Sequence, residues 1–325
     1  MSALPETPFG DISEEEFKSR FSGVRAIAGI FFLVILLTHV SILFFEMFLT
    51  IIGGYTYLVI FLYLPLSIEI IVQNNYVLAL LFNTFIQMIL LTSIVWLFVN
   101  RDYGVIEDIK ENNLERGLIS FSEAFLATFA ISIIWFLIFP IESPFINPDE
   151  DFIFAVTVLA PIFEEISFRF VFLLFPIALV KIITKKRKSK DILREILVGT
   201  NENNRLQAIF LIISSILFGY VHVLYGWPLV KIPQAVLLGF TMGYFAIRSG
   251  ILASIGLHWA INSFSIMPDF LILIGESSEG ILYSISILTQ TAVLAIGLLV
   301  TIVLIYRIIN YRQKKQRRSE NEYVV

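Results

Sequence analysis

Long apolar segments recur along the chain from residue 26 onward, separated by short polar and charged stretches. Most approach the roughly 20 residues that an α-helix needs to cross a bilayer. The pattern predicts an all-α fold, a polytopic transmembrane helix bundle of about eight spans. The predicted spans are 26–51, 77–99, 119–140, 152–183, 206–225, 228–247, 250–268 and 283–306.

One further apolar stretch, YTYLVIFLYLPLSIEIIV (55–72), does not fit this pattern well. It contains Pro65 and Glu69 and follows Gly53-Gly54. We interpret it as either a re-entrant segment or a ninth span. The basic segments favour the first, because an even number of spans places all of them on one side of the membrane.

The basic segments set the expected orientation. Lys18, Arg20 and Arg25 precede the first span, KKRKSK (185–190) follows the fourth, and RQKKQRR (312–318) follows the last. Basic loops stay in the cytoplasm. We therefore expect both termini to be cytoplasmic in a multi-pass protein of the cell membrane. The acidic loop at 141–152 then lies outside.

The composition is typical of a membrane protein and excludes any chemistry that needs cysteine. The chain is 57% hydrophobic and 15% charged, with a mean hydropathy of +0.84, whereas soluble domains are about one quarter charged. It has no cysteine. This excludes disulfides, thiolate metal sites and a cysteine nucleophile. The expected surroundings are the lipid bilayer, with no nucleic-acid partner.

Three charges interrupt the apolar run APIFEEISFRFVFLL (160–174). A charge near the middle of a span costs roughly 2.5–3.5 kcal/mol or more, so this group needs an explanation. Glu165 and Arg169 are spaced i, i+4 on a helix and are expected to pair. The plainest alternative for the whole group is a set of stabilising ion pairs between helices.

Glu164 has no cation on its own helix face, since it is rotated about 100° from Glu165. Desolvation favours the neutral form of a carboxyl group, which is the condition for a general base that works near neutral pH. Pro161 lies just upstream and is expected to bend the helix and admit water. Glu164 is therefore the candidate base.

The three histidines divide into two kinds. His39 has no carboxylate pair in its segment and is expected only to form a hydrogen bond between helices. His222 follows Phe218 by four residues in FGYVH, and His258 precedes Asn262 by four in HWAIN. The His258–Asn262 face presents two donors that suit an oxyanion or a water molecule.

A metal site is an open alternative. The chain has no H-E-x-x-H helix, the usual zinc protease motif. Two imidazoles and one carboxylate from Glu164, His222 and His258 would nevertheless suit a catalytic zinc ion. A buried polar network without chemistry is a further alternative for the same set.

The motifs EEISFR (164–169), FGYVH (218–222) and HWAIN (258–262) together resemble the CPBP family of intramembrane proteases. This family includes the type II CAAX prenyl endopeptidases and bacteriocin-immunity-type proteins. Its pattern of E-E-x-x-x-R, F-x-x-x-H and H-x-x-x-N is matched in order and without substitution. The resemblance covers roughly residues 120–268.

The resemblance implies a reaction and a set of roles. Glu164 with His222 would activate the attacking water, His258 and Asn262 would stabilise the oxyanion, and Glu165 with Arg169 would form a supporting ion pair. The substrate would be a membrane-associated peptide or protein, CAAX-type or otherwise, and a metal mechanism and a metal-free glutamate mechanism both stay open. A transporter coupled to ions or protons and a non-catalytic scaffold are the competing functions.

The same considerations divide the chain into regions. We expect a cytoplasmic N-terminal segment (1–25), an N-terminal transmembrane region (26–118), a CPBP-like catalytic membrane core (119–268), a C-terminal span (269–306) and a basic cytoplasmic tail (307–325).

The sequence leaves open the side of the membrane to which the site opens. On straight helices, Glu164 is about 30 Å from Lys185, whereas His258 is about 15 Å from Arg248. These two distances from basic residues place Glu164 and His258 at different depths in the membrane.

Overall fold

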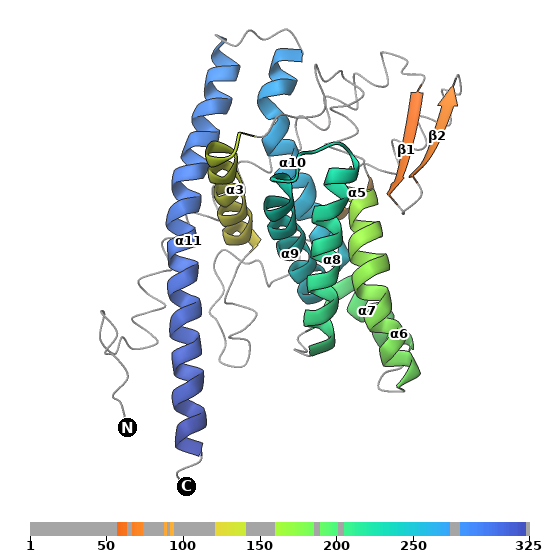
Figure 1. Ribbon diagram of the computed structural model, residues 1–325, viewed down its shortest axis with the longest axis vertical. Helices are drawn as coiled ribbons and strands as arrows, with labels where there is room; N and C mark the ends of the chain where they lie inside the picture. Colours follow the sequence, from red (N-terminus) through yellow and green to blue (C-terminus); the bar gives the residue numbers. More distant parts are fainter. Residues whose placement is uncertain are drawn as a thin grey trace.

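The computed structural model describes residues 57–63, 67–73, 88–89, 92–93, 121–140, 160–184, 189–200, 205–273 and 280–322. Within these residues a bundle of helices forms the body of the protein (Figure 1). The helices are α3 (Phe121–Ile138), α5 (Ala160–Glu164), η4 (Glu165–Leu174), α6 (Phe175–Ile183), α7 (Ser189–Val198), α8 (Arg205–Leu224), α9 (Lys231–Ser249), α10 (Ile251–Leu273) and α11 (Ile281–Glu322).

The helices agree with the predicted spans from residue 119 onward. Three helical stretches are long and apolar enough to cross a membrane, namely Ala160–Ile183, Arg205–Leu224 and Tyr283–Ile309, and two shorter apolar helices cover Ser122–Ile138 and Ile251–Ile266. The protein is therefore an integral membrane protein. The spans expected at 26–51 and over most of 77–99, together with His39 and the segment 1–25, lie outside the described residues.

The stretch at 55–72 differs from both expectations for it. It contains two antiparallel strands, β1 (Tyr57–Tyr63) and β2 (Ser67–Gln73), which pair in register from Tyr57 opposite Gln73 to Tyr63 opposite Ser67. Pro65 falls between the strands, where a helix would have been interrupted. The hairpin lies to one side of the helices (Figure 1) and is the exception to an otherwise helical fold.

Helix α10 occupies the centre of the bundle. It packs against α3, α5, α7, α9, α11 and η4. Its buried side chains point in every direction around the helix axis, among them Ala253, Leu257 and Trp259. A helix that is apolar all round is enclosed by protein. The polar residues that α10 carries are therefore held away from bulk water and need protein partners.

The loop between the fourth and fifth predicted spans contains a short helix. This is α7, which packs against α9 and α10. Thr200 N–H donates to Ile247 O at 2.8 Å, and Gly250 has a positive φ of 88°. A Cβ atom at Gly250 would overlap the carbonyl of Leu197. Glycine at this position therefore lets α7 lie directly against the α9–α10 junction.

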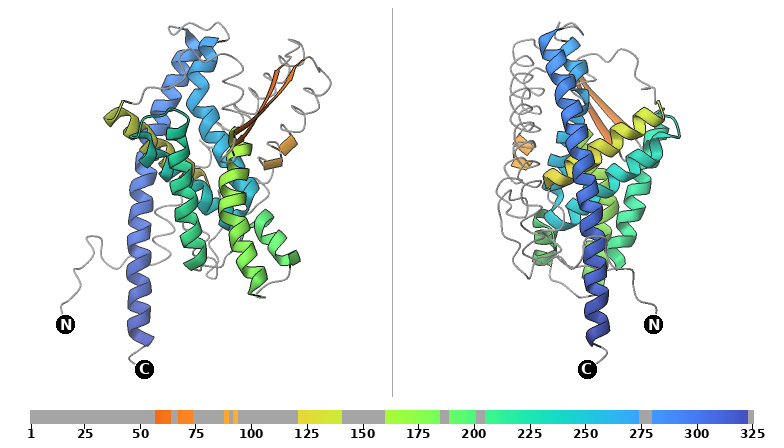
Figure 2. Two further views of the ribbon diagram at one scale, coloured as in Figure 1. Left: turned by 45° about the vertical axis from the view of Figure 1, so that its right-hand side comes forward. Right: turned by 90° about the vertical axis from the view of Figure 1, so that its left-hand side faces the viewer.

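Helix α11 is a single helix of 42 residues that continues past the predicted end of the last span at residue 306. It runs along the side of the bundle, and its C-terminal part extends beyond the other helices (Figure 2). Arg307 Nη1 donates to Glu123 Oε1 of α3 at 2.7 Å. This ion pair joins α11 to the beginning of α3.

Candidate active site

The two adjacent glutamates lie where the helix changes its winding. Glu164 is the last residue of the α-helix α5, and Glu165 is the first residue of η4, a π-helix of ten residues. Residues 141–159 lie outside the described part of the chain, so the bend expected at Pro161 stays a prediction. The change of winding that the structure does describe falls at the glutamate pair. Helices of this kind are rare and occur frequently at functional sites.

The expected ion pair between Glu165 and Arg169 is present. Arg169 Nε lies 3.2 Å from Glu165 Oε2, and both side chains are 0% exposed. The guanidinium also lies over the ring of Phe218, with Cζ 4.6 Å from the ring centroid, and its Nη1 donates to Ser214 Oγ at 3.4 Å. Three groups around one arginine, the Glu165 carboxylate, the Phe218 ring and the Ser214 hydroxyl, help to bury its charge.

Glu165 connects this pair to α10. Its Oε1 accepts from His258 Nδ1 at 2.9 Å, and its Oε2 is within hydrogen-bond reach of Ser254 Oγ. The Ser254 hydroxyl also lies 2.9 Å from Met242 O, and its single proton serves one of the two acceptors at a time. Glu165 therefore fixes both the position and the ring orientation of His258.

His258 is the imidazole that lies beside Glu164. Its Nε2 is 3.6 Å from Glu164 Oε2, which is too long for a hydrogen bond but close for opposite charges. The Glu164 side chain is 13% exposed, whereas that of His258 is 5% exposed. One histidine ring thus separates two carboxylates, one enclosed and one partly open.

His222 forms a hydrogen bond within its own helix. Its Nδ1 is 2.8 Å from Phe218 O on its own helix. A carbonyl oxygen can only accept, so Nδ1 carries the proton and Nε2 keeps its lone pair in the neutral ring. Among the described residues, no ion pair within 4.0 Å joins His222 to Glu164. Of the two histidines, His258 is the one within ion-pair distance of Glu164, and the role expected of His222 stays a prediction.

Phe218 explains why the second motif begins with phenylalanine. Its ring packs edge-to-face against His222 at 4.9 Å between centroids and against His258 at 5.9 Å. The same ring lies under Arg169. One aromatic side chain therefore brings α8, α10 and η4 together, and it places both imidazoles around one point. The i, i+4 spacing to His222 was the only sequence signal for it.

Asn262 lies one turn beyond His258 on α10 and is half-buried. The spacing of four residues keeps both side chains on one face of that helix. This is the arrangement that the third motif predicts. The structure thus brings Glu164, Glu165, Arg169, His222 and His258 into one connected region, with Asn262 at its edge.

Sequence analysis missed three residues at this site. Ser254 and His258 are spaced i, i+4, and this spacing could have identified the serine. Ser214 donates to Phe168 O at 2.7 Å and receives Arg169, but nothing in its segment indicates this. The third residue is Lys231, at the start of α9.

Lys231 is a buried cation held by aromatic rings. Its Nζ lies 4.6 Å from the ring centroid of Phe136 and 4.5 Å from that of Trp227, and the residue is 8% exposed. The described residues supply it with no ion pair. Its charge nevertheless acts on Glu164. Lys231 therefore adds positive potential on the partly open side of the cluster.

The donor geometry does not fit the zinc alternative. Within the described residues, which include Glu164, His222 and His258, no group of three or more His, Cys, Asp or Glu side chains is arranged to hold a metal ion. His222 Nδ1 is engaged by a backbone carbonyl, and both nitrogens of His258 face carboxylates.

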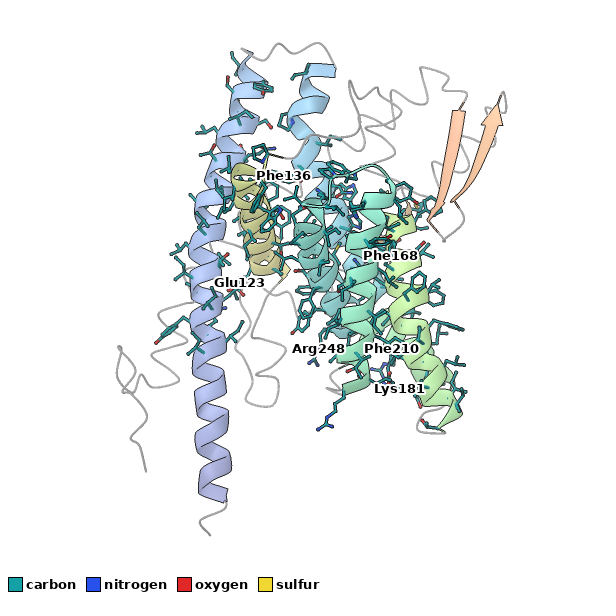
Figure 3. The ribbon with its side chains drawn as sticks, in the orientation of Figure 1. Glu123, Phe136, Phe168, Lys181, Phe210 and Arg248 are labelled. Carbon is teal, nitrogen blue, oxygen red and sulfur yellow. The ribbon has the colours of Figure 1, made fainter. Side chains whose placement is uncertain are left out.

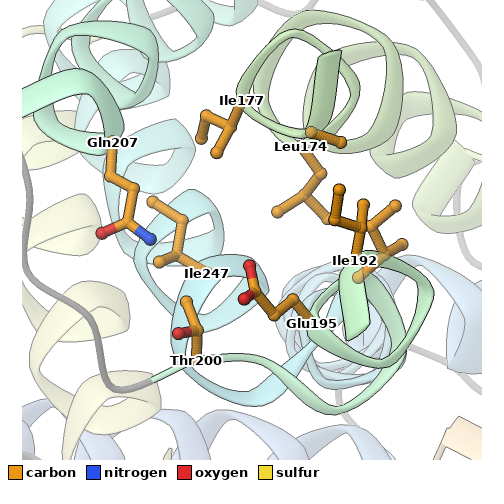
Figure 4. A pocket seen from close by; sticks show the side chains of 9 residues that line it. Leu174, Ile177, Ile192, Glu195, Thr200, Gln207 and Ile247 are labelled. Carbon is orange, nitrogen blue, oxygen red and sulfur yellow. The ribbon is translucent and has the colours of Figure 1, made fainter. Parts of the chain in front are cut away.

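A separate cavity lies toward the other end of the bundle, between η4, α6, α7, α8 and α9 (Figure 4). Its walls are mainly apolar, with Leu174, Ile177 and Ile247 among the lining residues, and its polar groups come from Glu195, Thr200 and Gln207. Glu195 accepts from Lys181 Nζ. No member of the glutamate–histidine cluster lines this cavity.

Comparison with known proteins gives one match. Residues 151–264 match the family model described as type II CAAX prenyl endopeptidase Rce1-like. The matched segment is less than half of the chain, and it contains Glu164, His222, His258 and Asn262. No protein of curated function and no solved structure matched the chain.

Proposed function

We propose that this protein, whose residues 151–264 are a Rce1-like type II CAAX prenyl endopeptidase domain, is an intramembrane endopeptidase. It would hydrolyse a peptide bond of a membrane-associated protein. The observation that supports this most directly is the position of Glu164, partly open and 3.6 Å from His258 at a change of helix winding. A carboxylate held beside an imidazole, with limited access for water, suits general-base catalysis.

The proposed reaction begins with proton transfer to Glu164. A water molecule, oriented by the lone pair of His222 Nε2, gives a proton to Glu164 while its oxygen attacks the carbonyl carbon of the peptide bond. Glu164 then passes this proton to the peptide nitrogen as the C–N bond breaks. The products are one chain with a new carboxyl group and one with a new amino group.

The oxyanion of the tetrahedral intermediate would be stabilised from α10. His258, with a proton on each ring nitrogen, donates Nδ1–H to Glu165 and presents Nε2–H to the oxyanion. Asn262 adds an amide N–H from the next turn. Donors of this kind act most strongly where water is excluded. Glu165 and Arg169 are positioning residues, because they act through the orientation of His258.

The substrate class that fits is a protein or peptide held in the bilayer. The family name points to prenylated CAAX-type substrates, and an immunity or regulatory role on another membrane peptide is equally compatible with the site. An ion-coupled carrier would also place glutamate and histidine in a membrane core. Uptake into liposomes that Glu164→Gln abolishes, without any peptide cleavage, would favour the carrier.

The test is a cleavage assay with purified protein in liposomes, using a panel of membrane-anchored peptides that includes prenylated ones. Glu164→Gln, His222→Ala and His258→Ala are each expected to lower kcat by about 10²–10⁴-fold. Glu195→Gln is the matched control, because it makes the same chemical change at the separate cavity. Thermal unfolding of each variant confirms that it is folded.

Two outcomes would contradict the proposal. One is a folded Glu164→Gln variant that cleaves as fast as the unsubstituted protein. The other is cleavage by no form of the protein on any peptide of the panel. The same assay with a zinc chelator is expected to leave the rate unchanged, since the donor geometry supports a metal-free mechanism.

A further inference from the structure

The glutamate–histidine cluster lies toward one end of the bundle. His222 is two residues from the end of the span Arg205–Leu224, so at about 1.5 Å per residue its Cα atom lies about 3 Å from that end. Glu164 is far from Ile183, where the antiparallel span Ala160–Ile183 reaches the other end of the bundle, at about 28 Å on the same measure. In Figure 3 Phe168 lies on this side, whereas Lys181 and Arg248 lie toward the other.

The two ends differ sharply in the charge of the segments that join their helices. At the end that holds the cluster, the connections 139–159 and 274–280 contain Asp and Glu but no Lys or Arg, and the connection 225–230 has no charged residue. At the opposite end, KKRKSK (185–190) follows α6 and RQKKQRR (312–318) is in the last turns of α11. The bundle therefore has one acidic end and one basic end.

Aromatic side chains gather at the acidic end, where α8 leads into α9. Tyr225 and Trp227 follow α8, and Trp135 Nε1 donates to Val230 O at 2.8 Å. Tryptophan and tyrosine concentrate where a membrane meets water. Lys231, the one basic residue here, has its Nζ packed on Trp227 and Phe136. His222 lies about one helical turn inside this layer.

Basic connections remain in the cytoplasm, so the acidic end faces outward. Resting on the proposed function, we propose that the active site lies in the extracytoplasmic half of the membrane. The peptide bond that it hydrolyses then lies at the outer leaflet. Its substrate class is a membrane-anchored peptide exposed on the outer surface, rather than a lipidated protein carried on the cytoplasmic surface.

The chain has no cysteine, so single-cysteine variants can report the side of each end. Leu229→Cys lies in the α8–α9 connection, and Thr184→Cys lies at the end of α6; both positions are exposed and outside the cluster. Reactivity of each thiol with a maleimide is first established in detergent. Intact cells that express each variant are then treated with a membrane-impermeant maleimide before and after permeabilisation.

The expected result is that Leu229→Cys is labelled in intact cells and Thr184→Cys only after permeabilisation. The reverse pattern, or equal labelling of both positions, overturns the proposal. A second experiment places the cleavable segment of one anchored peptide on the inner or the outer side of proteoliposomes in which the enzyme has one orientation. Loss of cleavage is expected when the segment faces the basic end.

The two experiments separate the two proposals. If the unsubstituted protein cleaves neither peptide, the proposed function fails, while labelling still decides the position of the cluster. If it cleaves the peptide on the basic side only, the protease stands and the outer location is wrong.

Discussion

Two buried ion pairs in this protein have nearly the same composition and different surroundings. Glu123 and Arg307 join α3 to α11 with both side chains at most 7% exposed. Glu165 and Arg169 belong to one helix and are both 0% exposed. The first pair links two helices outside the matched domain. The second reaches His258 and, through that ring, Glu164.

The difference shows that burial of a charge pair does not reveal its role. Either pair needs its partner, because a lone charge in this environment is costly. Only the Glu165 carboxylate also orients an imidazole. We therefore expect both pairs to matter for stability and only one to matter for activity.

Arg169→Ala is expected to have the largest effect on stability. It leaves Glu165 buried without a cation, at about 3–5 kcal/mol by the usual cost of breaking a buried pair. The measurement is the free energy of unfolding in detergent. Arg194→Ala, an exposed arginine on α7, is the control and should change stability by about 0.5 kcal/mol or less. Native stability of Arg169→Ala would show that the pair is unimportant.

Glu123→Gln is expected to cost about 3 kcal/mol, the lower end of the same range, because Arg307 keeps some exposure. The double variant Glu123→Leu, Arg307→Met should recover most of this loss, since apolar replacement of a whole buried pair is often neutral. Its rate of cleavage per folded molecule should equal that of the unsubstituted protein. A drop in that rate would show that the Glu123–Arg307 pair also matters for activity, contrary to the distinction drawn between the two pairs.

Ser254→Ala should have a smaller effect on stability, about 1–2 kcal/mol for a lost hydrogen bond to a buried charge. Because the Ser254 hydroxyl reaches the carboxylate that holds His258, kcat should fall as well. Ser214→Ala removes a hydroxyl from the Arg169 side of the pair and is the matched comparison. If both serine variants lower kcat equally, the orientation of His258 is not the cause.

Lys231→Met should have the smallest effect on stability, because the lost cation–π contacts, worth about 2 kcal/mol at a desolvated site, are offset by the removal of a buried charge. Methionine keeps the apolar packing against Phe136 and Trp227. The loss of a positive charge that acts on Glu164 should lower kcat/KM severalfold. Lys231→Arg, which keeps the charge, should retain more activity than Lys231→Met. An equal loss of activity in the two variants would mean that the shape of the lysine side chain, rather than its charge, is needed at this position.

Sequence reasoning reached the parts of the site that depend on local spacing. The Glu165–Arg169 pair follows from an i, i+4 interval, and the helices from residue 119 onward follow from apolar run lengths. The pair Glu123–Arg307 did not follow, because its members are far apart in the chain and neither stands out locally. The change to a π-helix at Glu165 has no signature in its residues.

Tertiary placement accounts for the remaining differences. Spacing places His222 on one helix face with Phe218 and His258 on one face with Asn262, but only packing between the helices brings His258 within ion-pair distance of Glu164. The hairpin at 57–73 is apolar enough for a membrane helix, and composition alone does not distinguish the two structures. The metal alternative likewise depended on distances between helices that no local pattern contains.

The long helix α11 has a consequence for the depth of cleavage. Its apolar window ends at Ile309, one turn before the basic sequence RQKKQRR (312–318), whose composition suits lipid headgroups. Arg307 joins α11 to α3, and Trp135 joins α3 to the α8–α9 connection beside His222. In the proposed protease, these contacts would fix the distance between the surface of one leaflet and the bond that is cut. In bilayers of different thickness, hydrophobic mismatch would then shift which bond of a substrate is cut.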